Sequence, residues 1–477
     1  MPQKDPQYRI LDKDLGRLSN AEHARVVSGQ PVLRLGIALV FMAVMAIFAS
    51  ATVAGQPATG LMAASIAVAL YLALSIGAND VANSLSPAVG AGAIGLVAGL
   101  CLVAVVEVAG ALLASGPVAR TLMQGLIGNA YHTGGPTANL MLAALAGAAT
   151  CISIATWLNA PISTTHSIVG AIAGAGVAVY GLTSVNWPAL AFVAMGWVAS
   201  PIVSALLAAG LLSSMHRNIL DKDDPITAGR SWLTLMIGAT TAILALFGGL
   251  AYGKPNWALV ALTGLGAALL AAGYTYHRLG QQIAQGEKGD SDGIALKHLL
   301  GLPLIVTAVI MGFGHGANSS AKVAAPLTTI LTSIDGDGPL LLSPLVVLGL
   351  AGLGIAMGVI LFGGRLVQMV GTRITQLNPA RGFCVTLAAA LTVLAFSMLG
   401  LPVSTTHISV GGVFGVGLYR ELRDRRKAKK RAPLPEEEVE RRQLVRWSYV
   451  RRILGAWLVT VPVNAVVAGL LASLIGP

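Results

Sequence analysis

The chain has 477 residues, of which 55% are hydrophobic and only 11% are charged, and its mean hydropathy is +0.75. Soluble proteins carry about 25% charged residues, so this composition excludes a soluble globular domain and predicts an integral membrane protein. The net charge of +11 lies mostly in two peripheral segments, 1–34 and 420–452, which indicates membrane topology rather than nucleic-acid binding.

Thirteen apolar segments follow one another along the chain, each long enough or nearly long enough to cross a bilayer as a helix. In chain order they lie at 32–54, 61–90, 93–115, 138–158, 161–182, 187–213, 232–252, 256–276, 298–333, 340–364, 383–399, 402–419 and 453–475. The second and ninth are long and polar in their interior, so we expect a broken helix in each. The fifth and twelfth begin with proline motifs, which suit half-helices or re-entrant hairpins. The predicted fold class is therefore an all-α polytopic membrane protein with about 12–13 transmembrane segments.

The basic residues indicate how these segments are oriented. If the polar residues 1–31 form a cytoplasmic tail and the segments alternate in direction, 28 of the 31 Lys and Arg residues lie on the cytoplasmic side. Two others, Arg120 and Lys254, lie outside, and Lys322 lies within a segment. Because basic loops remain in the cytoplasm, this distribution predicts insertion in the plasma or inner membrane, with the N-terminus inside and the C-terminus outside.

The second segment contains the polar sequence GANDVAN at 77–83. Asp80 and Glu107 are the only acids of the chain's 20 that lie within apolar segments. A charge at bilayer depth costs roughly 2.5–3.5 kcal/mol, so an acid at such a position is a candidate for a functional site. The related sequence GANSSAK at 316–322 lies in the ninth segment and predicts an equivalent site element there.

A second pair of motifs indicates an internal repeat. PISTTHSIVG begins at Pro161 and PVSTTHISVG begins at Pro402, and the two pairs have nearly equal spacing: 86 residues from Gly77 to Ser163 and 88 from Gly316 to Ser404. Both motifs recur seven segments later, and an odd offset reverses orientation, so we expect inverted repeats with a substrate site at their interface. We expect a tail at 1–31, a leading helix at 32–54 and a first repeat at 61–213. A connecting region at 214–297 leads to a second repeat at 298–475, which includes a basic cytoplasmic loop at 420–452.

The proline-Ser-Thr motifs favour anion binding. On a surface helix they would serve only to cap the helix N-terminus. Inside a membrane protein, such a terminus presents free N–H donors and partial positive charge, and its hydroxyls add further donors. Two termini brought together by pseudo-symmetry would surround a small tetrahedral oxyanion, with hydroxyls from Ser163, Thr164, Thr165, Ser404, Thr405 and Thr406.

The GANDVAN motif suits a coupling cation. Asp80, Asn79 and Asn83 offer acceptor oxygens for a hard cation such as Na⁺, or Asp80 carries a proton. The alternative is a carboxylate paired with a neighbouring helix for structure. Glu107 is equally consistent with a buried protonated acid and with a coupling role. For His166 and His407, a structural hydrogen bond is favoured over proton relay. His315, which precedes the second GAN motif, is equally ambiguous between these roles.

These four motifs together resemble the inorganic phosphate transporter family, the PiT-type permeases, over roughly residues 60–475. The resemblance implies symport of inorganic phosphate with Na⁺ or H⁺ by an inverted-repeat helical protein that often dimerises. It assigns functional roles to the polar residues of the first GAN motif, to both STT triplets and to Asn318 of the second copy. Residues 1–55 lie outside the family core and add a leading helix.

The second GAN copy departs from the family pattern. Ser319 stands where family members commonly have Asp, and Lys322 stands where the first copy has Asn83. This half has exchanged a carboxylate for an ammonium, so Lys322 replaces a cation or contacts the anion directly. The alternative is a lysine that extends to the membrane interface.

We therefore expect a secondary phosphate symporter that is embedded in the lipid bilayer and has phosphate as its partner. A permease for sulfate or another tetrahedral oxyanion is the alternative, and a channel or receptor-like protein is a third. No nucleophile–base set, metal cluster or cofactor motif is present in the sequence, and the three cysteines lie in apolar segments without metal or disulfide spacing, so we expect neither an enzyme nor a metal site.

Overall fold

The computed structural model describes residues 31–49, 51, 59–128, 135–158, 162–251, 256–285, 298–335, 342–373, 378–428 and 447–476. These residues form helices, and their one β-type pairing is an isolated bridge between Ile127 and Val185. Eleven of the described helices are long and apolar enough to cross a membrane. The expectation of an all-α, multi-pass membrane protein is confirmed.

The described helices begin with a leading helix, Pro31–Ala49. The others are α2 (Thr59–Gly90), α3 (Leu96–Ala114), α4 (Gly116–Gly125), α5 (Gly135–Trp157), α6 (Thr164–Tyr180), η2 (Leu182–Ser184), α7 (Trp187–Met215), η3 (His216–Leu220), α8 (Pro225–Ala251), α9 (Trp257–Gln285), α11 (Gly301–Asp335), α12 (Pro344–Arg373), α13 (Pro379–Met398), α14 (Thr405–Ala428) and α16 (Trp447–Ile475).

Each of the thirteen predicted segments coincides with a helix, and the two that are not candidate spans are the STTH helices. α6 has 17 residues, so it is about 26 Å long and falls short of a full crossing. α14 continues beyond its apolar part into the charged sequence at 420–428. α4 lies outside the thirteen predicted segments; it is a ten-residue helix that follows α3 after a single residue.

The expectation of broken helices at the two GAN motifs is wrong. α2 is helical through 77–83, and α11 is helical through 316–322. The backbone has no need to open because the motif side chains find partners on other helices: Asn79 on α5, Asp80 on α6 and Asn83 on α14. The residues directly before α6 and α14 are non-helical instead, and the first residues of both helices are buried.

Glycines in the motifs allow four pairs of helices to approach closely. A Cβ atom at Gly77 of α2 would collide with the backbone of α12, and one at the equivalent Gly316 of α11 would collide with the backbone of α3. Likewise Gly170 of α6 lies against α16, and its equivalent Gly411 of α14 lies against α7. Each motif helix therefore packs against a helix from the other half of the chain.

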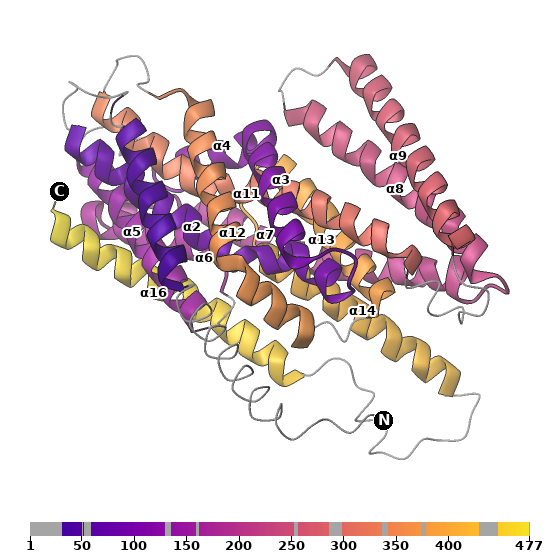
Figure 1. Ribbon diagram of the computed structural model, residues 1–477. Coiled ribbons are helices and arrows are strands. Elements are labelled where there is room, and N and C mark those ends of the chain that lie inside the picture. The colour runs from indigo at the N-terminus through magenta and orange to yellow at the C-terminus, as the bar shows by residue number, and fades with distance from the viewer. Residues whose placement is uncertain are drawn as a thin grey trace, which may run out of the picture.

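The residue numbers of these contacts rise together in both members of a pair, so the paired helices run parallel. Between α2 and α12, Gly354 faces Ala73 and Gly363 faces Val81. Parallel neighbours point the same way through the membrane, which agrees with the predicted alternation of the segments. α8 and α9 pack against each other at one end of the molecule (Figure 1), and Phe247 of α8 contacts Phe313 of the motif helix α11.

Candidate functional site

The polar centre of the protein lies where α2, α3, α6, α11 and α14 meet, and it is shielded from solvent. Glu107, His315 and Lys322 are fully buried, and Asp80 is 1% exposed. Charged groups removed from water require partners, so the geometry around these four side chains determines what the centre can bind.

The first residues of α6 and α14 form two equivalent caps. Ser163 Oγ accepts a hydrogen bond from His166 N at 3.2 Å, and Ser404 Oγ accepts one from His407 N at 3.3 Å. These serines satisfy one backbone donor each at a helix end that is buried. Both serines therefore cap their helices, and each keeps its own hydroxyl proton, so anion binding by Ser163 and Ser404 stays a prediction.

The two termini are joined directly. Thr165 Oγ1 donates to the carbonyl oxygen of Val403 at 2.7 Å, which brings the start of α6 beside the residue before Ser404. Asn318 of α11 accepts from Val403 N at 3.3 Å and donates to Leu401 O at 3.1 Å and to Ser397 Oγ at 2.9 Å. Asn318 therefore fixes the extended segment that leads into α14.

Asp80 contacts the first terminus. Its Oδ2 atom accepts a hydrogen bond from Thr164 Oγ1 at 2.8 Å and lies 3.3 Å from His315 Nε2. Its Oδ1 atom is buried and has no hydrogen-bond partner among the described residues, and the same holds for Oδ1 of Asn79. Two adjacent residues of α2 thus carry buried acceptor oxygens without donors, and unpaired buried acceptors of this kind suit a cation.

His315 links Asp80 to Glu107. Its Nδ1 atom lies 2.7 Å from Glu107 Oε1, so the imidazole bridges two carboxylates that come from different helices. The sequence leaves the role of His315 open, because nothing in it shows that the residue preceding the second GAN motif faces α3. The one available signal was its position directly before that motif.

Lys322 lies inside the centre and does not extend to an interface, so that alternative is wrong. Its Nζ atom donates to Ser319 Oγ at 3.3 Å and to Thr164 Oγ1 at 3.5 Å. Thr164 is therefore shared between the ammonium of α11 and the carboxylate of α2. The two residues that depart from the family pattern contact each other at this point.

The remaining predicted residues, Asn79 and Asn83, lie one helical turn apart on α2 and bond to different neighbouring helices. Asn83 Nδ2 donates to Thr406 Oγ1 at 3.0 Å and approaches Thr405 Oγ1 at 3.4 Å, which places it at the second terminus. Asn79 Nδ2 donates to Thr156 Oγ1 of α5 at 2.9 Å. The structure thus brings all predicted site residues into one region.

The histidines of the two STTH motifs also meet. The rings of His166 and His407 lie 4.5 Å apart in an edge-on arrangement, and His166 lies 4.0 Å from the ring of Trp197. Trp197 Nε1 donates to Pro402 O at 3.0 Å. This aromatic contact holds the two helix starts together from α7. The described residues contain no group of three His, Cys, Asp or Glu side chains that would hold a metal ion.

Comparisons with known proteins agree with the predicted family. The model of the phosphate transporter family matches residues 76–468. A Helicobacter pylori protein named "Putative phosphate permease" is 30% identical over 97% of this chain and 99% of its own length. A Pyrococcus abyssi protein with the same kind of name is 34% identical over 86% of this chain and 96% of its own. A solved structure entitled "The sodium-dependent phosphate transporter" has a TM-score of 0.77 and 29% identity, and covers 87% of this chain and 98% of its own.

Proposed function

Since the chain belongs to the phosphate transporter family, a family of transporters and not of enzymes, we propose that it is a secondary symporter that moves inorganic phosphate together with a cation. The observation that carries this proposal is the position of Thr164. Its hydroxyl lies between the ammonium of Lys322 and the carboxylate of Asp80, at the buried start of α6. The hydroxyl of Thr164 therefore belongs to the helix end that would bind an anion and also contacts the acid that would bind a cation.

Phosphate would bind between the starts of α6 and α14. Helix N-termini and hydroxyl donors suit the oxygens of a tetrahedral anion, and the termini are held together by the contact of Thr165 with Val403. Lys322 supplies a full positive charge beside the first terminus. Asn83 is placed by its bonds to Thr405 and Thr406 to orient hydroxyls of the second terminus.

The coupling ion would act through Asp80. A dianion or monoanion near an ionised carboxylate is disfavoured by charge repulsion, and a cation beside Asp80 removes that repulsion. The unpartnered Oδ1 atoms of Asp80 and Asn79 favour Na⁺ as this cation. In addition, Thr164 has a single hydroxyl proton, so it can donate to a phosphate oxygen only when Asp80 releases it. A cation that satisfies Asp80 would therefore favour phosphate binding.

A proton is the second candidate, on account of the Glu107–His315–Asp80 chain. Each of the two contacts between imidazole nitrogen and carboxylate oxygen, at 2.7 and 3.3 Å, requires one proton between its two atoms. Two protons must therefore be present among three groups. Loss of one would break a contact and add a negative charge to a buried site, which is the behaviour expected of a proton-coupling element.

The two halves, 61–213 and 298–475, would be inverted repeats that place this site between them, with 214–297 as the connection. The exchanged, parallel packing of the motif helices supports the repeat. With a cytoplasmic tail at 1–31 and a cytoplasmic basic loop at 420–452, the C-terminus lies outside. Dimerisation stays a prediction from the family resemblance.

Uptake into proteoliposomes tests the proposal. Labelled phosphate should accumulate when a Na⁺ gradient, a pH gradient or both are imposed, and the gradient that is required identifies the coupling ion. Phosphate counterflow without any gradient should also occur. Sulfate in tenfold excess should not compete; if sulfate competes as well as unlabelled phosphate, the protein is a general oxyanion permease.

A further inference from the structure

A separate pocket lies on the opposite side of α2 from the polar centre. It has a volume of about 490 Å³ and lies between the leading helix, α2, the end of α5 and α12. Ala78, which neighbours Asn79 and Asp80, is one of its lining residues. The leading helix that forms one wall precedes the region matched by the family model, which begins at residue 76.

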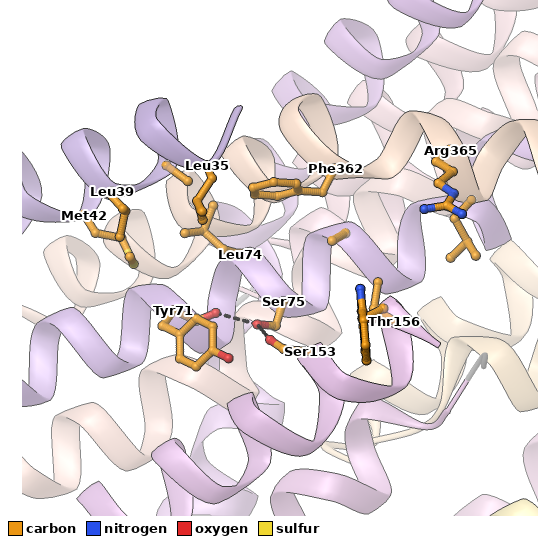
Figure 2. Close-up of a pocket in the computed structure, with 14 residues that line it drawn as sticks. Leu35, Leu39, Met42, Tyr71, Leu74, Ser75, Ser153, Thr156, Phe362 and Arg365 are labelled. Carbon is orange, nitrogen blue, oxygen red and sulfur yellow. Dashed lines mark hydrogen bonds between the residues drawn. The ribbon is translucent and has the colours of Figure 1, made fainter. Parts of the chain in front are cut away.

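The two ends of this pocket differ in chemistry. Figure 2 shows Leu39 and Met42 at one end and Arg365 at the other, with Leu35 and Phe362 between them. Arg365 is exposed and has no hydrogen bond or ion pair with any residue in the described part of the chain. The pocket is thus largely apolar, with a few hydroxyl groups along one wall and one cation at its end.

The two ends of the pocket lie where the headgroup and the acyl chains of the cytoplasmic leaflet would lie. The pocket uses the first half of the leading helix, the last part of α5 and the last part of α12, and all three lie toward the predicted cytoplasmic side. Arg365 lies eight residues before the end of α12, and Leu35 to Met42 extend from that side toward the membrane centre. The leading helix is also largely exposed along its apolar length, as expected for contact with lipid.

We propose that this pocket binds one anionic phospholipid of the cytoplasmic leaflet. The phosphodiester lies against the Arg365 guanidinium, which presents paired donors suited to phosphate oxygens. One acyl chain runs along Leu35, Leu39 and Met42 toward the bilayer centre. A free phosphate ion would use only the basic end and leave the apolar part of the pocket unfilled, so the lining favours a lipid.

Lipid binding at this pocket would affect the polar centre through the residues that line the pocket. Ser75 and Ser153 are hydrogen-bonded to each other at 2.8 Å within the lining, and Thr156 of the lining accepts the hydrogen bond from Asn79. An acyl chain packed against these residues holds the end of α5 against α2. The bound lipid would therefore stabilise the position of Asn79 without touching the phosphate site.

The test measures lipid binding directly and involves no transport, so it is independent of the substrate. The purified protein would be loaded with equal amounts of phosphatidylglycerol and phosphatidylcholine of the same acyl chains, and the retained lipid counted by native mass spectrometry. The wild-type protein should retain one phosphatidylglycerol with about fivefold preference, the effect of one basic residue on an anionic lipid. Arg365→Gln should lose the preference and Arg365→Lys should keep part of it.

Arg278→Gln, at an exposed arginine of α9, is the matched control and should behave as the wild type. Equal retention of the two lipids by the wild type, or an unchanged preference in Arg365→Gln, would overturn the proposal. Displacement of phosphatidylglycerol by millimolar inorganic phosphate would also overturn it, because Arg365 would then be a site for free anions.

Discussion

The hydroxyl oxygen of Thr164 lies 2.8 Å from Oδ2 of Asp80, although the two residues are 84 positions apart and belong to different motifs. This hydrogen bond joins the group suited to a cation to the helix end suited to an anion. Because Thr164 also contacts Lys322, a change in the charge of Asp80 alters the donors available to an anion.

Asp80→Asn should abolish gradient-driven accumulation of phosphate while the protein stays folded. The amide keeps the size of the side chain but removes the charge that would attract the coupling cation. Uptake into proteoliposomes under Na⁺ and pH gradients checks this, with phosphate counterflow as a measure of transport without coupling. Accumulation at the wild-type rate would show that Asp80 is structural.

Lys322→Gln should raise the phosphate concentration required for half-maximal uptake. Removal of a buried charge that faces the anion costs about 1.5–3 kcal/mol, equivalent to roughly a 10- to 150-fold change. Initial uptake rates over a range of phosphate concentrations measure this half-maximal concentration. A protein that is expressed normally and has wild-type kinetics would contradict a contact between Lys322 and phosphate.

The double substitution Ser319→Asp and Lys322→Ser restores an acid to the second GAN copy and removes the ammonium beside it. We expect stronger dependence of phosphate uptake on Na⁺ than in Lys322→Ser alone, because the second half would again offer a carboxylate to a cation. The ratio of uptake with Na⁺ to uptake with K⁺ is the measurement. Identical ratios in the two variants would refute this role for position 319.

Gly316→Ala should destabilise the protein, because a Cβ atom there would collide with the backbone of Glu107 on α3. Such overpacking costs about 1–3 kcal/mol. Gly301→Ala is the control, since a Cβ at Gly301 meets no atom within 4 Å. Thermal unfolding of the purified variants in one detergent should show a lower Tm for Gly316→Ala alone. Equal Tm values for the two variants would contradict the close packing of α3 against α11 at Gly316.

Much of the site follows from the sequence, because polar residues in apolar segments have few explanations. Asp80, Lys322 and the STT triplets stand out for this reason, and the structure brings them together. The unbroken course of α2 and α11 could not be predicted, since the partners that satisfy their polar side chains come from helices distant in sequence. The bridge from Glu107 to His315 likewise joins residues 208 positions apart and depends on how α3 packs against α11.

Equilibrium binding of labelled phosphate to the purified protein tests most directly whether the starts of α6 and α14 form one shared site. We expect one phosphate per chain, with affinity reduced in both Thr164→Val and Thr405→Val by about 1–3 kcal/mol, or roughly 5- to 150-fold, because each variant lacks a hydroxyl that would donate to a buried phosphate oxygen. Two independent phosphates per chain, or wild-type affinity in both variants, would contradict it.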